Sequence, residues 1–448
     1  MEKAFYLFWP APERLVAEGF STIAHVPCIF DGGWRYQEVA SRYLRARARS
    51  LNNLGGRRRH QNRPRYPTKK SLRSYGESLL NFLEWCAASS RDWVTLDYTD
   101  DLLHGYQADM SAGRWSARRV SLQARTINKR VDEACKFLQW AASQGLREPF
   151  DVPMREVSKP AKSGTSTRRG KWVSEVRVGS VRPDPITLRI PRDEEVTAWH
   201  RSVLVESGPT KALMCELVLE TAVRREEAVQ WRIDTLPINP DDWNITGDKV
   251  MVKIRHGTKG PKRVDGSGAE IGPARDISLP LTLAYALHQY RETVRPKLLA
   301  AYVKSASSLE EKRERMKNAT QRLFLSDHNG EPVSAQRFYE AWVGASRLPY
   351  PGWSPHLGRH WWACKTLLTV CRLRLGVAPG NQVFGEAEGV LISSANDAIM
   401  LVLGPQMGHI SEQTTKMYLV WIQRIFMLAT LHDDYEQALE SVAKTFGS

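Results

Sequence analysis

Arginine, histidine and tyrosine gather in three segments of the chain, and together these side chains could cleave a phosphodiester bond. The residues are Arg224, His356, Arg359, His409 and Tyr418. Without a metal ion, the non-bridging oxygens of the reacting phosphate need fixed cations, and the planar guanidinium of arginine can donate two hydrogen bonds to one phosphate. A tyrosine hydroxyl can attack phosphorus, but with a pKa near 10 it needs help in losing its proton. Histidine or lysine can transfer such protons.

The order and spacing of these segments resemble the signature boxes of the tyrosine recombinase (phage integrase) family. Arg224, with Glu227 three residues later, is similar to the first box, in which the arginine binds the scissile phosphate and the acid braces the site. His356 and Arg359 resemble the HxxR box. His409 matches the histidine-or-tryptophan box, and a tyrosine follows it by nine residues, as the family expects.

The resemblance implies a mechanism of two transesterifications. Tyr418 would attack a DNA phosphorus to give a 3′-phosphotyrosine and a free 5′-hydroxyl, and a 5′-hydroxyl from a partner strand would reverse the step. Arg224, Arg359 and His409 would hold the non-bridging oxygens, and His356 would assist proton transfer. Because the phosphotyrosine stores the bond energy, the resemblance implies no cofactor and no metal.

A lysine on a β-hairpin serves as general acid in that family. The segment Gly257-Thr258-Lys259 stands at a predicted hairpin, so Lys259 is the best match for this role. Lys253 and Lys262 lie nearby, and the choice among the three stays open.

The elements that must position these residues predict a mainly α fold with a small β-sheet, in the α+β class. We expect four regions: an N-terminal extension over 1–66, a helical core-binding domain over 67–150, a basic linker over 151–190 and a catalytic domain with a C-terminal tail over 191–448. In the catalytic domain, Leu213–Leu219 predicts a buried helix that ends near Thr221. Alternating apolar residues over 250–255, repeated at Ile277 and Leu279, predict a β-hairpin with a long tip.

Two amphipathic helices, near 68–85 and 126–142, define the expected core-binding domain. The second carries Asn128, Lys129 and Arg130 mostly off its apolar face, and these residues are candidates for DNA contacts.

A tract with Arg57, Arg58 and Arg59 lies before these helices, and the linker is also rich in lysine and arginine. Both could be solvated segments or could contact phosphates.

Composition agrees with a nucleic-acid partner. The 448 residues carry a formal net charge of +15 and a sequence pI of about 9.6, which attracts polyanions. Six scattered cysteines form no CxxC pair, and neither a signal peptide nor a membrane-spanning run is apparent. We therefore expect a cytoplasmic protein that is nucleoid-associated when bound to double-stranded DNA and that makes no membrane contact.

Recombination by this family would need four protomers, so we expect a homo-oligomer, a tetramer in the synaptic complex. The segment Trp421–Lys444 is a candidate for docking onto a neighbouring protomer. The N-terminal extension favours an enzyme of a mobile element, but integrase, transposase and resolvase roles are not separable from the sequence, nor is the target DNA.

Three features depart from the family pattern. Gly358 stands where leucine is usual, which predicts looser local packing. The 49 residues between Arg359 and His409 predict an insertion near 373–396. Residues 1–66 have no counterpart in the minimal fold.

Two alternatives remain open. A type IB topoisomerase shares this chemistry but relaxes DNA as a monomer. A DNA-binding protein with a recombinase-like fold and no catalysis is the other, although a complete set of reacting residues argues against it.

Overall fold

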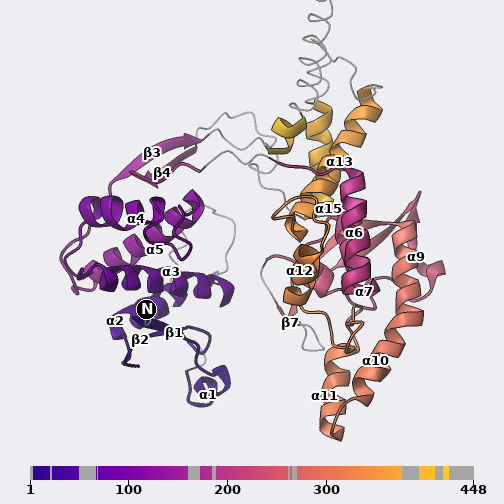
Figure 1. The fold of residues 1–448 in the computed structure, drawn as a ribbon, viewed down its shortest axis with the longest axis horizontal. Coiled ribbons are helices and arrows are strands. Elements are labelled where there is room, and N and C mark those ends of the chain that lie inside the picture. Colours follow the sequence, from indigo (N-terminus) through magenta and orange to yellow (C-terminus); the bar gives the residue numbers. More distant parts are fainter. Residues whose placement is uncertain are drawn as a thin grey trace, which may run out of the picture. The chain divides into compact units, whose positions relative to one another are not determined.

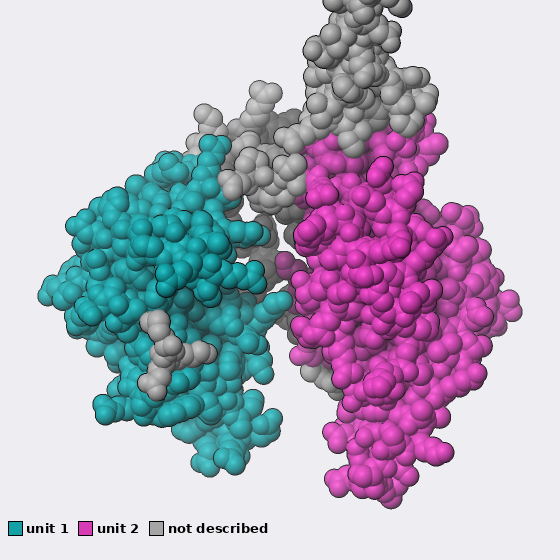
Figure 2. Space-filling model, viewed as in Figure 1, with its two compact units in different colours: residues 1–185 teal, residues 186–448 magenta. Residues whose placement is uncertain are grey.

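The computed structural model describes residues 4–20, 23–49, 67, 69–159, 172–183, 188–260, 263–264, 270–375, 393–408 and 417–422. The chain is mainly helical with small antiparallel sheets, as the sequence predicts (Figure 1). It divides into two compact units, Met1–Pro185 and Ile186–Ser448 (Figure 2). No stretch of the described helices combines the length and the apolar character that crossing a bilayer requires.

Unit 1 is built around two long helices, α3 (Lys69–Ala88) and α5 (Ala124–Ser143), which pack against each other. Its further elements are β1 (Phe5–Phe8), α1 (Pro12–Ala17), β2 (Cys28–Asp31), α2 (Glu38–Arg49), η2 (Tyr98–Gln107), α4 (Ala108–Ser111), β3 (Met154–Lys159) and β4 (Trp172–Arg177). Apolar residues at helical spacing supply the core, among them Phe82 and Leu138.

The N-terminal segment belongs to the same hydrophobic core as these helices. Ile29 and Leu44 are fully buried in it. The Tyr43 hydroxyl donates a 2.7 Å hydrogen bond to Glu133 on α5, and Arg47 forms an ion pair with the same carboxylate at 3.2 Å. The described part of the predicted extension is therefore packed into unit 1, rather than separated from it at residue 66.

The predicted linker contains regular structure that the composition does not reveal. Strands β3 and β4 pair antiparallel, with Met154 opposite Arg177. The Arg177 side chain is buried and donates to Tyr98 at 2.7 Å and to Gln107 at 2.9 Å. The composition indicated only a basic linker here, because short alternations are hard to detect among lysine, arginine and serine. The division between the units falls within the predicted 151–190 segment.

Unit 2 packs helices against a three-stranded sheet in the order β5-β6-β9. Its elements are α6 (Asp193–Ser207), α7 (Pro209–Thr221), α8 (Arg225–Val229), η3 (Pro240–Asp242), β5 (Asn244–Thr246), β6 (Lys249–Ile254), β7 (Arg263–Val264), β8 (Glu270–Ile271), β9 (Arg275–Pro280), α9 (Leu281–Gln289), η4 (Tyr290–Val294), α10 (Arg295–Lys304), α11 (Leu309–Ala319), α12 (Ala335–Gly344), α13 (Pro355–Leu375), η5 (Ile399–Leu403) and α15 (Gly404–Met407). Residues 393–398 and 417–422 are also helical.

The predicted hairpin is confirmed as the pair β6 and β9. Val252 lies opposite Ile277 and Val250 opposite Leu279, and all four side chains are buried. The alternation places these side chains on the face that packs against α7 and α9, as period-2 patterning requires. The predicted buried helix is α7, which ends at Thr221.

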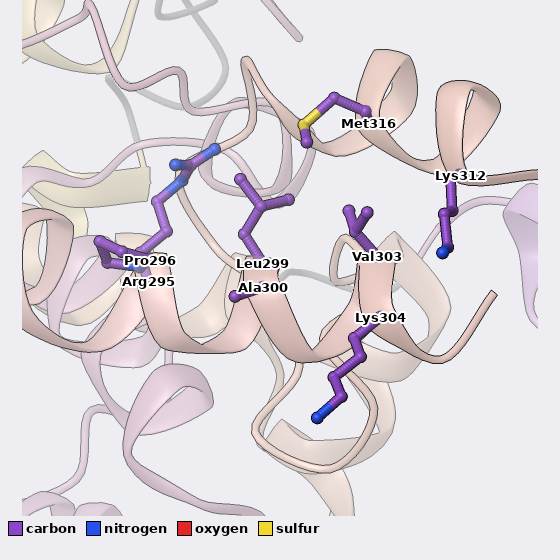
Figure 3. Close-up of a pocket in the computed structure, with 8 residues that line it drawn as sticks. All are labelled: Arg295, Pro296, Leu299, Ala300, Val303, Lys304, Lys312 and Met316. Atoms are coloured by element: carbon purple, nitrogen blue, oxygen red, sulfur yellow. The ribbon is translucent and has the colours of Figure 1, made fainter. Parts of the chain in front are cut away.

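A groove of about 440 Å³ lies between α10 and α11 (Figure 3). Leu299 and Val303 line it from α10, and Met316 lines it from α11. These helices carry none of the predicted site residues, so the candidate site is elsewhere.

Candidate active site

The chain reverses between α7 and α8, and this turn presents Arg224. Ala222 adopts a left-handed conformation with φ of 54°, and it ends α7. Arg224 then caps the N-terminus of α8, with its backbone N–H donating to the Glu227 carboxylate at 2.6 Å. Its Nη1 donates to the same carboxylate at 2.9 Å, so the two predicted residues hold each other.

Arg359 reaches the same place from α13. Its side chain is buried, and its Nη2 donates to the carbonyl of Met407 at 3.0 Å while its Nη1 donates to the carbonyl of Ala222. Nη1 also lies 3.8 Å from a carboxylate oxygen of Glu227. Burial, and then the charge of Arg224, lowers the pKa of Arg359 to about 9, which still leaves the guanidinium charged near neutral pH.

A third guanidinium, that of Arg275, completes the cluster and was not among the predicted site residues. Arg275 opens β9 and donates from Nη2 to Glu227 at 2.6 Å and from Nη1 to the carbonyl of Gln406. It shares the inward register of Ile277 and Leu279, so an arginine at this half-buried position of the strand needed an anionic partner. That register was the signal that could have found it.

The carboxylate of Glu227 is the centre of the cluster, since its side chain is fully buried among three guanidinium groups. Burial alone would raise its pKa, but Arg275 and then Arg224 lower the pKa below its ordinary value. Three cations around one anion leave a net positive charge in the site, and this charge favours a bound phosphate.

The turn after α15 is fixed to the same cluster. Gln406 donates to the carbonyls of Thr221 and Ser278, each at 2.9 Å. Arg224 donates to the carbonyl of Gly408, which has φ of 60°, and a Cβ at this position would lie 2.5 Å from the Arg275 side chain. His409 comes directly after this turn but lies outside the described residues, as do Arg57, Arg58, Arg59 and Lys262.

The hydroxyl of Tyr418 is held by a histidine of α13. His360 Nδ1 lies 2.7 Å from the Tyr418 hydroxyl, and Met407 Sδ lies 3.8 Å from it. Tyr418 is fully buried, and burial raises the pKa of its hydroxyl. His360 Nε2 lies 3.3 Å from His356 Nε2, so both histidines of the segment stand on one face of the helix. Their spacing of four residues was the signal for this pairing.

The exposed Lys259 lies at the start of the hairpin tip. Two residues before it, Gly257 has φ of 70°, and a Cβ there would lie 2.2 Å from the carbonyl oxygen of Glu226. The tip therefore leaves the sheet directly against α8, the helix whose N-terminus Arg224 caps. The other described candidate, Lys253, lies 3.8 Å from Asp276 on the neighbouring strand.

Gly358 does not loosen the packing, contrary to the prediction. A Cβ at this position would lie 2.7 Å from the ring of Trp342, so that ring occupies the space a larger residue would need. Trp342 is itself fully buried against Trp199 and Trp353. The glycine is a condition for close packing at α13.

In unit 1, the side-chain amide of Asn128, one of the predicted DNA contacts, is hydrogen-bonded to the backbone of Val181. Its Nδ2 donates to the carbonyl of Val181 at 2.7 Å, and its Oδ1 accepts from the Val181 N–H at 2.9 Å. Lys129 is exposed, and Arg130 lies 4.0 Å from the sulfur of Met110.

Among the described residues, no group of three or more histidine, cysteine or carboxylate side chains is placed to hold a metal ion. The free cysteines are buried, except for the half-buried Cys28.

Solved structures with a similar fold include the XerH site-specific recombinase bound to a palindromic difH substrate, at 15% identity and a TM-score of 0.40, over 84% of this chain and 80% of that one. A lambda integrase dimer bound to a COC′ core site aligns at 12% identity and a TM-score of 0.41, over 85% and 94% of the two chains. The Tn1549 transposon integrase in complex with circular intermediate DNA aligns at 11% identity and a TM-score of 0.43, over 85% and 93%. No protein-family model and no curated protein matches the chain. These structures are named as a recombinase and two integrases, in agreement with the family that the sequence resembles. At these TM-scores the likeness carries no further argument.

Proposed function

We propose that this chain is a tyrosine recombinase that cuts and rejoins double-stranded DNA through a 3′-phosphotyrosine at Tyr418. The observation that carries the proposal is the meeting of Arg224 and Arg359, which are far apart in sequence, on one buried carboxylate. Both also hold the turn that precedes His409, and the Tyr418 hydroxyl is hydrogen-bonded to the helix of Arg359.

The arginines would act on the charge that develops in the transition state. In the protein alone, Arg224 and Arg359 donate to backbone carbonyls as well as contacting Glu227. A phosphate oxygen is a stronger acceptor than a neutral carbonyl because it carries charge. Guanidinium groups held rigidly by such contacts need little reorganisation during the reaction, which is the basis of electrostatic catalysis.

Proton transfer would complete the step. The leaving 5′-oxygen is much more basic than a phenolate and requires a general acid, and Lys259 is the candidate because its segment lies against α8. His409, by its place after the Gly408 turn, would donate to a non-bridging oxygen. The reaction needs no external energy source, since the phosphotyrosine conserves the bond.

Further parts of the proposal concern assembly and biological context. Strand exchange would take place in a tetramer on DNA, with Trp421–Lys444 as the segment that docks onto a neighbour. Asn128, Lys129 and Arg130 of unit 1, together with Arg57–Arg59, are proposed DNA contacts, and the protein would act in the cytoplasm at the nucleoid. We propose a mobile element as the source.

A trapping experiment tests the activity. Nicked suicide duplexes taken from the DNA that flanks the gene lose a short fragment after cleavage, so a covalent protein–DNA complex accumulates. We expect wild type and Tyr285→Phe, an exposed tyrosine of the same unit, to form this complex. Tyr418→Phe should form none, while its affinity for DNA stays within a few-fold of wild type.

Three outcomes would change the proposal. Complex formation by Tyr418→Phe would remove Tyr418 from the role of nucleophile. Relaxation of supercoiled plasmid by a monomer, without strand exchange between two sites, would favour the topoisomerase alternative. Binding without any covalent complex would favour a non-catalytic DNA-binding protein.

A further inference from the structure

Three side chains in unit 2 form a continuous hydrogen-bonded path from a buried hydroxyl to the protein surface. Tyr418 is fully buried and its hydroxyl lies 2.7 Å from Nδ1 of His360. His360 is also buried, and its Nε2 lies 3.3 Å from Nε2 of His356, whose side chain is exposed. The two imidazole rings are 4.6 Å apart between centroids.

The donors and acceptors along this path can all point in one direction. A neutral imidazole has one nitrogen that donates and one that accepts. If the Tyr418 hydroxyl donates to Nδ1 of His360, then Nε2 of His360 carries a proton and donates to Nε2 of His356. Each group can then donate its proton to the next group along the path towards the surface.

Because the Tyr418 hydroxyl is buried, its proton needs an acceptor within the protein. Bulk water does not reach a hydroxyl with no exposed surface, so water cannot act there directly as a base. Among the described contacts of this hydroxyl, the other acceptor is the Met407 sulfur at 3.8 Å, and a thioether accepts hydrogen bonds only weakly. Burial, and then His356 and Arg359, lowers the pKa of His360 to about 4, so its ring is neutral near pH 7 and free to accept.

We propose that His360 takes the phenolic proton of Tyr418 and passes its own Nε2 proton to His356 during attack on DNA. The inference rests on the proposed function and adds His360 to the reacting groups. As the Tyr418 oxygen forms its bond to phosphorus, its proton moves to Nδ1 of His360. The Nε2 proton of His360 moves to His356, which becomes an imidazolium, and the bond from phosphorus to the 5′-oxygen breaks with a proton supplied by the general acid.

A bound phosphate would favour the transfer. The charged or titratable groups that face the path are Arg224 and Arg359 near the histidines, and Cys364 near Tyr418. Desolvation, and then the charges of Arg359 and Arg224, lowers the pKa of His356 in the protein alone. A phosphate held between the arginines would offset their charge, and His356 would become a better base when substrate is present.

The test compares His360→Asn with wild type and with His200→Asn. Asparagine can keep the hydrogen bond to Tyr418 but cannot pass a proton on. His200 is a half-buried histidine of the same unit whose Nε2 lies 2.9 Å from the carbonyl of Ala212. Single-turnover cleavage of the nicked suicide duplex is measured from pH 6 to pH 9, and DNA affinity and thermal unfolding are measured in parallel.

We expect His360→Asn to cleave at least about 100-fold more slowly at pH 7, the scale of lost general-base catalysis. The deficit should shrink about tenfold for each pH unit above 7, because the pKa of Tyr418 is raised, so the fraction already ionised grows about tenfold per pH unit, and a phenolate needs no base. A duplex with sulfur in place of the 5′-bridging oxygen has a better leaving group. This sulfur-containing duplex should restore the cleavage rate of Lys259→Ala, because it no longer needs a general acid. Cleavage by His360→Asn should remain slow. His200→Asn should match wild type throughout.

Two results would overturn the relay while leaving the proposed function intact. One is cleavage by His360→Asn within about threefold of wild type, and the other is a deficit that stays constant with pH. The absence of any covalent complex from wild type would overturn the proposed function together with the relay. Should His360→Asn fail to fold, ¹⁵N NMR of wild type decides the same point. A protonated Nε2 on His360 supports the relay, and a protonated Nδ1 contradicts it.

Discussion

At the scale of single residues, the candidate site depends on one carboxylate. Glu227 is the only acid within contact of Arg224, Arg275 and Arg359 in the described part of the chain. A buried ion pair contributes little net stability, but removing one partner leaves uncompensated charge in a medium of low polarity. The same carboxylate therefore supports the fold and the orientation of the guanidinium groups.

We expect Glu227→Gln to lower the free energy of unfolding by about 3–5 kcal/mol at pH 7, the cost of breaking a buried pair. Because the pKa of Glu227 is lowered in the folded protein, this stabilisation is present above about pH 4.3 and is lost as the pH falls through the folded value. Urea denaturation measures the change. The neighbouring Glu226→Gln is the control, since Glu226 is exposed, and an equal loss in both variants would contradict the central role of Glu227.

A second prediction at this scale concerns acid stability and His360. The pKa of this ring is lowered to about 4 when folded, against about 6.5 in an unfolded chain. Between these values the unfolded chain binds more protons, so the free energy of unfolding falls as the pH falls from 6.5 towards 4. The difference between the two pKa values corresponds to about 3 kcal/mol in the free energy of unfolding. His360→Asn lacks this contribution and should show a shallower loss between pH 7 and pH 4. Parallel curves for the two proteins would show that the ring is not buried in its neutral form.

At the scale of elements, helix α13 carries His356, Arg359 and His360 at once. Its position depends on the close approach of Gly358 to Trp342. Trp342 packs on Trp199 at 4.4 Å between ring centroids, so its ring has little room to move. A displacement of this helix would therefore move Arg359, the proposed phosphate contact, together with the two histidines of the proposed proton relay.

We expect Gly358→Ala to destabilise the protein by about 1–3 kcal/mol, the usual cost of overpacking. The higher helix propensity of alanine, up to about 1 kcal/mol, offsets part of that cost. Cleavage should slow as well, because α13 shifts. Gly344→Ala is the matched control, since a Cβ at Gly344 meets nothing within 4 Å. Thermal unfolding and single-turnover cleavage are the measurements, and a Gly358→Ala protein as stable as the control would show that the Trp342 ring can yield.

Patterns confined to one element were predictable from the sequence, and contacts between elements were not. The alternation at Val250 and Val252 and the apolar run of α7 are local signals, and both elements form as predicted. Arg275 was missed because its function depends on Glu227, which lies on another element. The hydrogen bond of Asn128 to Val181 was not predictable, because helical spacing shows that a residue is off the apolar face but not which distant backbone it contacts.

At the scale of the whole molecule, the positive charge of the site is supplied by side chains. Arg224, Arg275 and Arg359 come from separate elements of unit 2, and the formal charge of the full chain is +15. Such a surplus attracts DNA over distances set by the ionic strength.

We expect cleavage to continue in excess EDTA at the rate of the untreated control. The reason is that, in the proposed mechanism, the guanidinium groups would perform the charge stabilisation that metal ions provide in metal-dependent nucleases. Single-turnover cleavage of the suicide duplex, with and without chelator, is the measurement. Loss of cleavage that returns on adding magnesium would contradict the proposed chemistry.

The complete burial of Tyr418 has a consequence for how such an enzyme would search a genome. A protein held to DNA by phosphate contacts slides and hops over many sites for each one at which it reacts. While the hydroxyl stays covered, every one of these visits is chemically silent, because no phosphorus atom comes within reach of the nucleophile. Fidelity would then be decided after binding, by whatever admits the scissile phosphate to Tyr418 at the right sequence while the hydroxyl stays hydrogen-bonded to His360. A variant in which Tyr418 is less well covered would produce nicks at scattered DNA sequences, even with its DNA affinity unchanged.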